Sequence, residues 1–486
     1  MNYKWTALTV TVVGTLMAGI DSRIVIIGLP TIASQLHAGA EAVIWITQVY
    51  VLACTVGLLL VGRISDIFGR IKMYNIAFMI FTAGSALSAF AANAPQLIAF
   101  RAIQGVGAGI LVTNASTIVT DASPKKELGT MLGINQTAFR VGQVAGLTLS
   151  GLILTVVNWR GLFWVNIPIG IFGTIWGYKR LREIAAKDPI KKIDWTGFVL
   201  FLVGFTLILL AVTFLSYGLS GTVEGFSFLI VGIALLALFI KSETRISFPL
   251  LDLQLFKIKQ FAMANISQAL NAVTWGGLAL LLSFYLQIGQ GYTPLQAGIA
   301  ILPLDVTYVV SSLIGGKLSD KHGIRMLTTV GLSMNAACFF VMATFGQATL
   351  YVEVALVLAF LGIGNGLFTP PNLRAIMGSV PPTRIGIASA FRNTMFYMGL
   401  AVSYGLVILF ITFGIPYNAF STLLQNTGVH VSSSVATLEF FNGYRIASLI
   451  MAIIGVIAII PAAMRGMDDS GIRQKVSETD LAAAME

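Results

Sequence analysis

The sequence is poor in charge. Only 10% of its 486 residues are charged, whereas soluble globular domains carry roughly 25%. Hydrophobic residues make up 56% of the chain, and its mean hydropathy of +0.86 leaves no room for a large soluble domain. Because long apolar stretches fold in lipid as helices, we expect an all-α polytopic membrane protein.

Residues that carry redox, metal or nucleophilic chemistry are also scarce. The 2 cysteines, Cys54 and Cys338, lie far apart in apolar stretches, which excludes a disulfide framework and metal-ligand spacing. No nucleotide-binding loop of the form G-x-x-x-x-G-K-[ST] occurs, so ATP is not the expected energy source. The predicted spans contain no nucleophile motif and no paired His and Asp, so we expect neither an enzyme nor a cofactor or metal site.

What the sequence has instead is long apolar runs. A helix needs about 20 mainly apolar residues to cross the hydrocarbon core. Fourteen stretches qualify, which predicts 14 transmembrane helices. They lie near residues 5–28, 43–62, 73–92, 96–118, 131–157, 161–182, 194–216, 225–241, 260–288, 295–316, 326–346, 351–378, 386–413 and 444–464.

The basic residues predict the orientation, since Lys and Arg collect in short cytoplasmic loops. Placing both termini inside puts 24 of the 30 basic residues on the cytoplasmic side. We therefore predict a multi-pass protein of the plasma membrane with cytoplasmic termini. The net charge of +10 is spread over many loops and forms no single stripe, so nucleic acid is not an expected partner.

Two sets of residues recur along the chain. The segment 62–70 follows the second span, and a similar segment, 316–323, follows the tenth span 254 residues later. Three glycines of the fourth span recur in the twelfth: Gly105, Gly107 and Gly109 against Gly362, Gly364 and Gly366. A shift of eight spans implies two six-helix halves with two helices inserted between them, a transporter architecture. The expected domains are an N-terminal bundle (1–182), the inserted pair (183–258), a C-terminal bundle (259–464) and a tail (465–486).

These segments carry a family resemblance. The loop 62–72 resembles the loop motif of the major facilitator superfamily, and residues 97–108 resemble the superfamily's fourth-helix motif. Residues 20–30 and 158–170 are similar to first-helix and sixth-helix motifs of its fourteen-span drug:proton antiporters. On these residues the chain is identified as a member of that multidrug efflux branch. The resemblance implies the major facilitator fold, with two six-helix halves plus two inserted helices.

Two positions depart from that branch. Arg23 stands where a small or hydroxyl residue is usual, and Leu147 stands where the fifth-helix antiporter motif has proline. The missing proline weakens the inference to antiport and leaves the superfamily resemblance intact. The motif's glycines are kept, at Gly142, Gly146 and Gly151. Their spacing suits either generic close packing of helices or a specific role in closing the cavity.

Asp21 and Arg101 are the expected proton-coupling residues. An ionisable side chain inside the bilayer is costly, so each one calls for a functional hypothesis. Asp21 lies about seven residues from the outer end of its span, roughly 10 Å deep, and Arg101 has a similar depth on the fourth span. We therefore predict that they pair. Burial and a neighbouring cation act on a carboxyl in opposite directions, which suits a site whose protonation changes. The alternative is a static ion pair that fixes packing.

Two further charged residues lie inside spans. Asp305 is near the middle of span ten with no basic residue close to it in sequence, so we expect contact with a cationic substrate or a proton, or a structural hydrogen bond. Arg23 lies about 200° around the helix from Asp21. If Asp21 faces the cavity, Arg23 should face away and extend its side chain to the lipid headgroups.

The loop after span two is expected to act as a conformational latch on the cytoplasmic side. Its glycines allow close approach of the backbone, and its charges can interact with helix dipoles and with the other half. A role for the basic residues in setting topology is compatible. The latch residues are Gly62, Arg63, Asp66, Gly69 and Arg70, with Asp320 as the repeat mate of Asp66.

The substrate cavity is inferred from the spans that line it in the family. Its candidates are Gln136, Arg140, Asn271, Trp275, Asp305, Tyr308, Asn393 and Tyr397. Trp275 suits a flat cation, although core packing explains it equally well. We expect a monomer that exports amphipathic, cationic small molecules by alternating access, driven by protons. The alternative is a proton-linked transporter of one metabolite, working in either direction.

Overall fold

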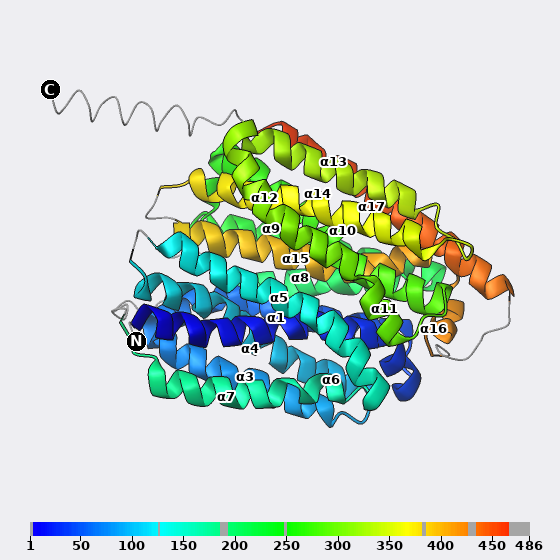
Figure 1. Cartoon of the computed structure of the whole chain (residues 1–486), viewed down its shortest axis with the longest axis horizontal. Coiled ribbons are helices and arrows are strands. Elements are labelled where there is room, and N and C mark those ends of the chain that lie inside the picture. Colours follow the sequence, from blue (N-terminus) through cyan, green and yellow to red (C-terminus); the bar gives the residue numbers. More distant parts are fainter. Residues whose placement is uncertain are drawn as a thin grey trace.

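The computed structural model describes residues 3–124, 127–184, 193–246, 250–381, 385–425 and 434–465. Every regular element in these ranges is a helix. Figure 1 shows long helices running side by side from one end of the molecule to the other, with the N-terminal half below and the C-terminal half above. α1 begins at the left end, and α17 runs toward that same end.

Fourteen passes run through the bundle within the described ranges, so the predicted fold class is confirmed. The N-terminal half consists of α1 (Tyr3–Leu36), α2 (Ala40–Phe68), α3 (Arg70–Ala89), α4 (Ala94–Ala122), α5 (Leu128–Val156), and α6 (Gly161–Trp164) with α7 (Asn166–Arg180). The inserted pair is α8 (Trp195–Leu215) and α9 (Thr222–Glu243). The C-terminal half consists of α10 (Lys259–Phe284) with the π-helical turn η3 (Tyr285–Gly289), α11 (Pro294–Ala300) with α12 (Leu302–His322), α13 (Ile324–Met342), α14 (Tyr351–Gly378), α15 (Ile385–Ile411) and α17 (Ser434–Ala463).

Several helices are longer than the apolar runs that predict them. Twelve are long and apolar enough to cross a membrane by length and composition, and the remaining passes are α3 and the pair α6 and α7, broken at Val165. α1 continues through Pro30 to Leu36, and its last buried residue is Ala33. Packing against neighbouring helices therefore keeps these additional turns helical, although their local sequence alone would not predict a helix there.

The two halves repeat one packing pattern. α4 packs on α2 and α3, and α14 packs on α12 and α13. The repeated glycines make these contacts, because a Cβ on Gly105 would meet the backbone of α2 and one on Gly362 would meet the backbone of α12. Gly69 and Gly323, at equivalent positions, begin α3 and α13 with φ of 105° and 81°, a conformation that favours glycine. The predicted internal repeat is confirmed.

The inserted helices lie over a seam between the halves. α8 and α9 pack on each other, and α8 also touches α2 of one half and α15 of the other. α9 exposes Val223, Phe226 and Ile230, as a lipid-facing helix does. The predicted domain limits near residues 182 and 258 fall in the links before α8 and before α10.

The halves are joined at the end of the bundle away from the N-terminus. The Ala40 amide donates to Ser421 Oγ at 3.0 Å, which ties α2 to the short helix α16 (Tyr417–Gln425). Gln287 Nε2 donates to the Ile27 carbonyl at 3.1 Å, from η3 to α1. α16 lies between the predicted spans 386–413 and 444–464. These contacts close this end, which we call the far end.

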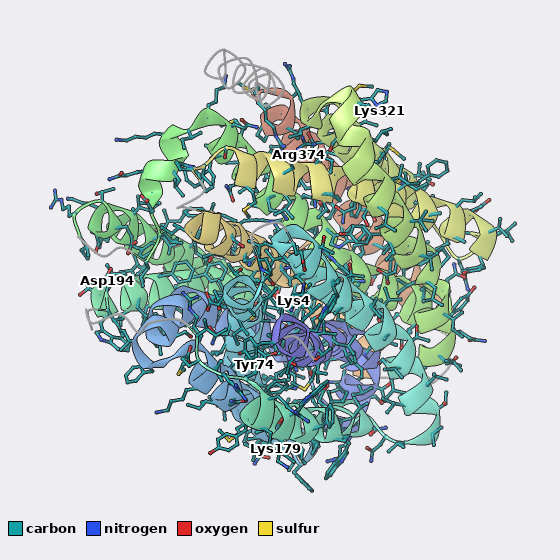
Figure 2. The ribbon with its side chains drawn as sticks, turned by 60° about the vertical axis from the view of Figure 1, so that its left-hand side comes forward. Lys4, Tyr74, Lys179, Asp194, Lys321 and Arg374 are labelled. Carbon is teal, nitrogen blue, oxygen red and sulfur yellow. The ribbon has the colours of Figure 1, made fainter. Side chains whose placement is uncertain are left out.

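The opposite end, which we call the near end, is rich in basic side chains. Figure 2 brings this end forward and labels Lys4, Lys179, Lys321 and Arg374 on it. Lys4 pairs with Glu127 at 2.6 Å, within the N-terminal half. Because basic residues collect on the cytoplasmic side of membrane proteins, this distribution favours the near end as the cytoplasmic end.

Candidate functional site

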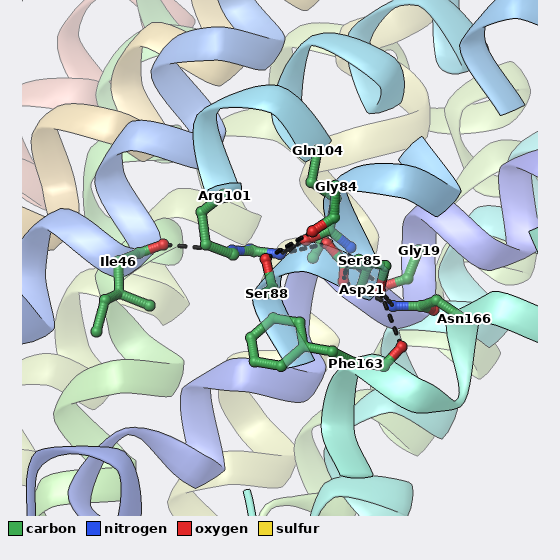
Figure 3. Close-up of polar contacts among 11 residues, drawn as sticks. Gly19, Asp21, Ile46, Gly84, Ser85, Ser88, Arg101, Gln104, Phe163 and Asn166 are labelled. Atoms are coloured by element: carbon green, nitrogen blue, oxygen red, sulfur yellow. Dashed lines mark hydrogen bonds and ion pairs between the residues drawn. The ribbon is translucent and has the colours of Figure 1, made fainter. Parts of the chain in front are cut away.

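Asp21 lies at the centre of a polar network inside the N-terminal half. Its Oδ2 accepts a hydrogen bond from Arg101 Nη1 at 2.7 Å, an ion pair. Its Oδ1 accepts from Gln104 Nε2 at 2.8 Å and from Asn166 Nδ2 at 2.9 Å. Figure 3 shows these side chains converging from α1, α4 and α7. The predicted contact between Asp21 and Arg101 is confirmed, and its role in coupling stays a prediction.

The network is closed to solvent. Asp21 is 0% exposed and Arg101 is 2% exposed. The Arg101 guanidinium carbon lies 4.0 Å from the centre of the Tyr50 ring, and Nη1 also donates to Gln104 Oε1 at 2.7 Å. An isolated carboxylate in such surroundings would be very costly, and the three side-chain donors around Asp21 offset that cost.

A second buried ion pair crosses between the halves. Arg23 Nη1 of α1 donates to Asp305 Oδ1 of α12 at 2.9 Å. Arg23 is 7% exposed and Asp305 is 4% exposed. The expectation that Arg23 reaches the lipid headgroups is therefore wrong.

The reason lies in the position of α1. It packs against α4, α5 and α7 on one side and against α10 and α11 on the other, so both sides of the helix face protein. Asp21 turns into its own half, and Arg23, about 200° away, turns toward the other half. We expected Asp305 to contact a cationic substrate because no basic residue lies close to it in sequence. In the structure Arg23 is its basic partner.

Polar contacts continue from α1 toward the middle of the molecule. Gln143 Nε2 of α5 donates to Ser22 Oγ at 3.4 Å, and Gln143 Oε1 accepts from Arg140 Nη1 at 2.9 Å. The Arg140 guanidinium carbon lies 5.0 Å from the centre of the Tyr308 ring on α12. Ser22 therefore links the α1 segment that carries both ion pairs to a side chain at the seam between the halves.

A pocket lies between the two halves, with lining residues from α1, α4, α5 and α15. Four of the predicted cavity residues line it: Gln136, Arg140, Asn393 and Tyr397. Sequence reasoning missed others that also line it, among them Thr15, Asn135 and Arg392. Arg392 lies seven residues after Ile385, the first residue of α15, so it is about two helical turns from the near end.

The other predicted cavity residues are not among the lining of this pocket. Asn271, Trp275, Asp305 and Tyr308 are all buried. Asn271 Nδ2 donates to Asn365 Oδ1 at 3.0 Å. The Trp275 ring packs on Tyr308 with centres 5.8 Å apart, and the same Tyr308 ring lies 5.0 Å from the Arg140 guanidinium carbon. Of these four, Tyr308 contacts the pocket lining, through Arg140.

The glycines of the antiporter motif have two different contacts. A Cβ on Gly142 or Gly146 would meet backbone atoms of α1, in the same half. A Cβ on Gly151 would lie 2.7 Å from Leu295 Cα of α11, in the other half. The first two glycines therefore allow α1 and α5 to pack closely, and the third allows the two halves to meet.

Gly146→Ala should lower the thermal unfolding midpoint of the detergent-solubilised protein by several degrees. The added Cβ would lie 2.5 Å from the Ile20 carbonyl oxygen, closer than real contacts allow, so α1 and α5 must separate. Gly133→Ala on the same helix is the matched control, because a Cβ there meets nothing within 4 Å. Alanine should be neutral or stabilising at that position. Equal midpoints for the two variants would contradict this packing argument.

The described part of the latch lies at the near end. Arg70 Nη1 bonds to both carboxylate oxygens of Asp121, at 2.6 and 2.7 Å, within the N-terminal half. Glu183 accepts from the Arg70 and Ile71 amides at 3.2 and 3.1 Å, at the start of α3. Gly62 lies within α2. The side chains of Arg63, Asp66 and Asp320 lie outside the described residues, so the latch stays a prediction.

Most of the chain matches a known family. The model of the Major Facilitator Superfamily matches residues 11–404 and 264–480. The chain belongs to this superfamily. A crystal structure of a bacterial homologue of the human lysosomal transporter Spinster, in an inward-facing conformation, matches it with a TM-score of 0.67 at 16% identity, covering 95% of this chain and 97% of that chain. That likeness supports the fold.

Two named relatives of this chain are transporters of small molecules. It is 31% identical to the riboflavin transporter RibZ of Clostridioides difficile over 86% of this chain and 90% of that protein. It is 27% identical to the multidrug transporter protein MdtP of Bacillus subtilis, over 83% and 74% of the two chains. The chain is therefore a secondary transporter of this superfamily and not an enzyme.

Residues missed at the sequence level did carry signals. Gln104 and Asn166, which hold Asp21, lie inside the fourth-helix and sixth-helix motifs of the superfamily resemblance. Arg392 is an ionisable residue within a span, which is by itself a reason to suspect function. The partnership of Arg23 with Asp305 had no such signal, because 282 residues separate them.

Proposed function

We propose that the chain exports amphipathic small molecules in exchange for protons, acting as a monomer in the plasma membrane with both termini in the cytoplasm. The observation that carries this proposal is the fully buried carboxylate of Asp21, which has one cation, Arg101, at 2.7 Å. Protonation of Asp21 cancels its attraction to Arg101, and release of the proton restores it. The contact between α1 and α4 would therefore follow the protonation of one residue.

α1 would transmit this change to the rest of the protein. Arg23, two residues after Asp21, holds Asp305 in the other half at 2.9 Å. Ser22, between them, connects through Gln143 to the pocket residue Arg140. A small shift of α1 that follows protonation therefore acts on the seam and on the pocket together.

Alternating access would require the far end to open. In the structure this end is closed by contacts such as Ala40 with Ser421 and Arg23 with Asp305, whereas the pocket lies toward the near end. Separation of these pairs would expose the pocket on the other side of the membrane. A driving force of about 180 mV supplies roughly 4 kcal/mol per proton, which suffices for a gradient of about a thousandfold.

A second candidate function is proton-linked transport of one metabolite. The relative with 31% identity is named a riboflavin transporter, and Arg23 and Leu147 both depart from the antiporter pattern. Such a transporter would use the same ion pairs and accept a single class of compound.

Proteoliposomes with an imposed pH gradient test both functions. The panel should contain fluorescein, rhodamine 123, ethidium and riboflavin. Uphill movement of several compounds against the proton gradient supports drug export. Movement of riboflavin alone, with counterflow of labelled against unlabelled riboflavin, supports the metabolite transporter. No gradient-dependent flux of any compound would contradict the proposal of proton coupling.

The latch is proposed to hold the near end closed when the far end opens. Asp66→Asn should then slow exchange across the membrane more than it weakens substrate binding, because the latch acts on the conformational change. Exchange is measured by counterflow in proteoliposomes and binding by fluorescence titration in detergent. Equal exchange rates for Asp66→Asn and the unmodified protein, at equal protein levels, would remove Asp66 from the latch.

A further inference from the structure

The pocket between the halves has two positive side chains in its lining and no negative one. Arg140 comes from α5 and Arg392 from α15, and the remaining lining residues are uncharged. Two carboxylates inside the predicted spans already have a cation as partner: Asp21 pairs with Arg101 at 2.7 Å, and Asp305 pairs with Arg23 at 2.9 Å. The two arginines of the pocket therefore have no counter-charge among its lining residues.

Their hydrogen bonds are to neutral groups. Arg140 Nη1 donates to Gln143 Oε1 at 2.9 Å, and Arg392 Nη1 donates to Asn393 Oδ1 at 3.0 Å. Arg392 Nε is buried and has no partner among the described residues, and the same holds for Nδ2 of Asn135, which is 2% exposed. Both unsatisfied atoms are N–H donors. These two buried donors therefore lack acceptors, and a buried donor without an acceptor is costly.

The rest of the lining is apolar or aromatic. Val112, Phe139 and Phe396 supply this surface. A ligand that matches the whole pocket would have one end rich in anionic oxygens and another end that is apolar. Oxygen anions bound by guanidinium groups form charge-assisted hydrogen bonds, which are stronger than hydrogen bonds between neutral groups.

We infer that this pocket binds organic anions, with a carboxylate, sulfonate or phosphate between Arg140 and Arg392 and an apolar or aromatic body against Phe139 and Phe396. This inference rests on the proposed function, in which the pocket is the transport site, and it replaces the cationic preference expected from Asp305. Because Arg140 and Arg392 belong to opposite halves, a bound anion draws the two halves together across the pocket.

Two matched pairs of fluorescent compounds test the charge preference. Fluorescein and rhodamine 123 share a ring system and differ in charge, and riboflavin 5′-phosphate differs from riboflavin by its phosphate. Binding is measured by anisotropy or quenching with the purified, detergent-solubilised full chain at neutral pH and low salt. In each pair the more anionic compound should bind at least about tenfold more tightly, as expected for charge-assisted hydrogen bonds. Equal binding within both pairs, or tighter binding of rhodamine 123, overturns the inference.

Arginine variants assign that preference to the pocket. Arg140→Gln and Arg392→Gln should each weaken binding of the anion at least about tenfold, and the double variant should remove the preference. Arg140→Lys keeps the charge and should keep most of the preference. Arg445→Gln is the matched control, since Arg445 is an exposed arginine on α17 that is not in the pocket lining. A normal elution profile in size-exclusion chromatography shows that a variant is folded. Full anion preference in the folded double variant would place the anion elsewhere and overturn the inference.

The binding assay uses no membrane gradient, so it separates this inference from the proposed function. Loss of charge preference with intact proton-driven transport would overturn the anion site alone. Anion binding without any gradient-driven transport would overturn proton coupling alone.

Discussion

Asp21→Asn should abolish gradient-driven accumulation of substrate and leave substrate binding in place. The amide keeps an oxygen for Gln104 and Asn166, which now donate to Asp21 at 2.8 and 2.9 Å, but it cannot take up or release a proton. Transport should therefore continue only down the substrate gradient, and the final concentrations inside and outside should become equal. Accumulation and counterflow in the same proteoliposomes measure the two properties separately.

Glu353→Gln is the control for the loss of a carboxylate. Glu353 lies in the first turn of α14, where its Oε2 accepts from the Leu350 amide at 3.3 Å, outside the Asp21 network. Its substitution should leave accumulation unchanged. If Asp21→Asn still accumulated substrate with normal proton coupling, Asp21 would not be the coupling carboxylate.

Removal of one partner from the pair of Arg23 and Asp305 should shift the protein strongly toward a state that is open at the far end. Arg23→Ala leaves the carboxylate of Asp305 buried without its cation, and loss of one partner of a buried pair costs about 3–5 kcal/mol. That cost falls on the closed state alone, so the equilibrium should shift by roughly a hundredfold or more. The exchanged pair, Arg23→Asp with Asp305→Arg, should restore much of the closed population.

Spin labels report this equilibrium directly. His37→Cys and Asn418→Cys place labels at two exposed far-end positions, one from each half. The native Cys54 and Cys338 are buried and should remain unlabelled. The distance between labels should increase in Arg23→Ala and in Asp305→Ala, and should return in the exchanged pair. Unchanged distances in both single variants would show that the pair does not hold the far end closed.

The sequence predicts the transmembrane helices and their internal repeat well, because membrane helices obey simple rules. The length of a span, the distribution of basic residues and the repeated glycines such as Gly105 and Gly362 each depend on local sequence. The pairing of Asp21 with Arg101 could also be predicted, since both depths follow from the rise per residue. The rise per residue and the boundary of each span were sufficient to predict that contact.

The contacts between the halves could not be predicted in this way. The angle between Asp21 and Arg23 around α1 was correct, but the angle does not reveal whether lipid or a second bundle lies on the other side. Asp305 is distant in sequence, and only the packing of the halves brings it to Arg23. Arg140 and Arg392 are likewise distant in sequence, and they line one pocket only because α5 and α15 face each other.

Three successive residues of α1 bond to different neighbouring helices, and these bonds restrict how α1 can move. Asp21 bonds to α4 and α7, Ser22 to α5, and Arg23 to α12. Each residue is offset from the next by about 100° around the axis. A spin of α1 about its long axis would break all three sets of bonds together. We therefore expect α1 to tilt or slide, and not to spin, in the proposed transport cycle. An alanine inserted before Asp21 would impose that spin permanently.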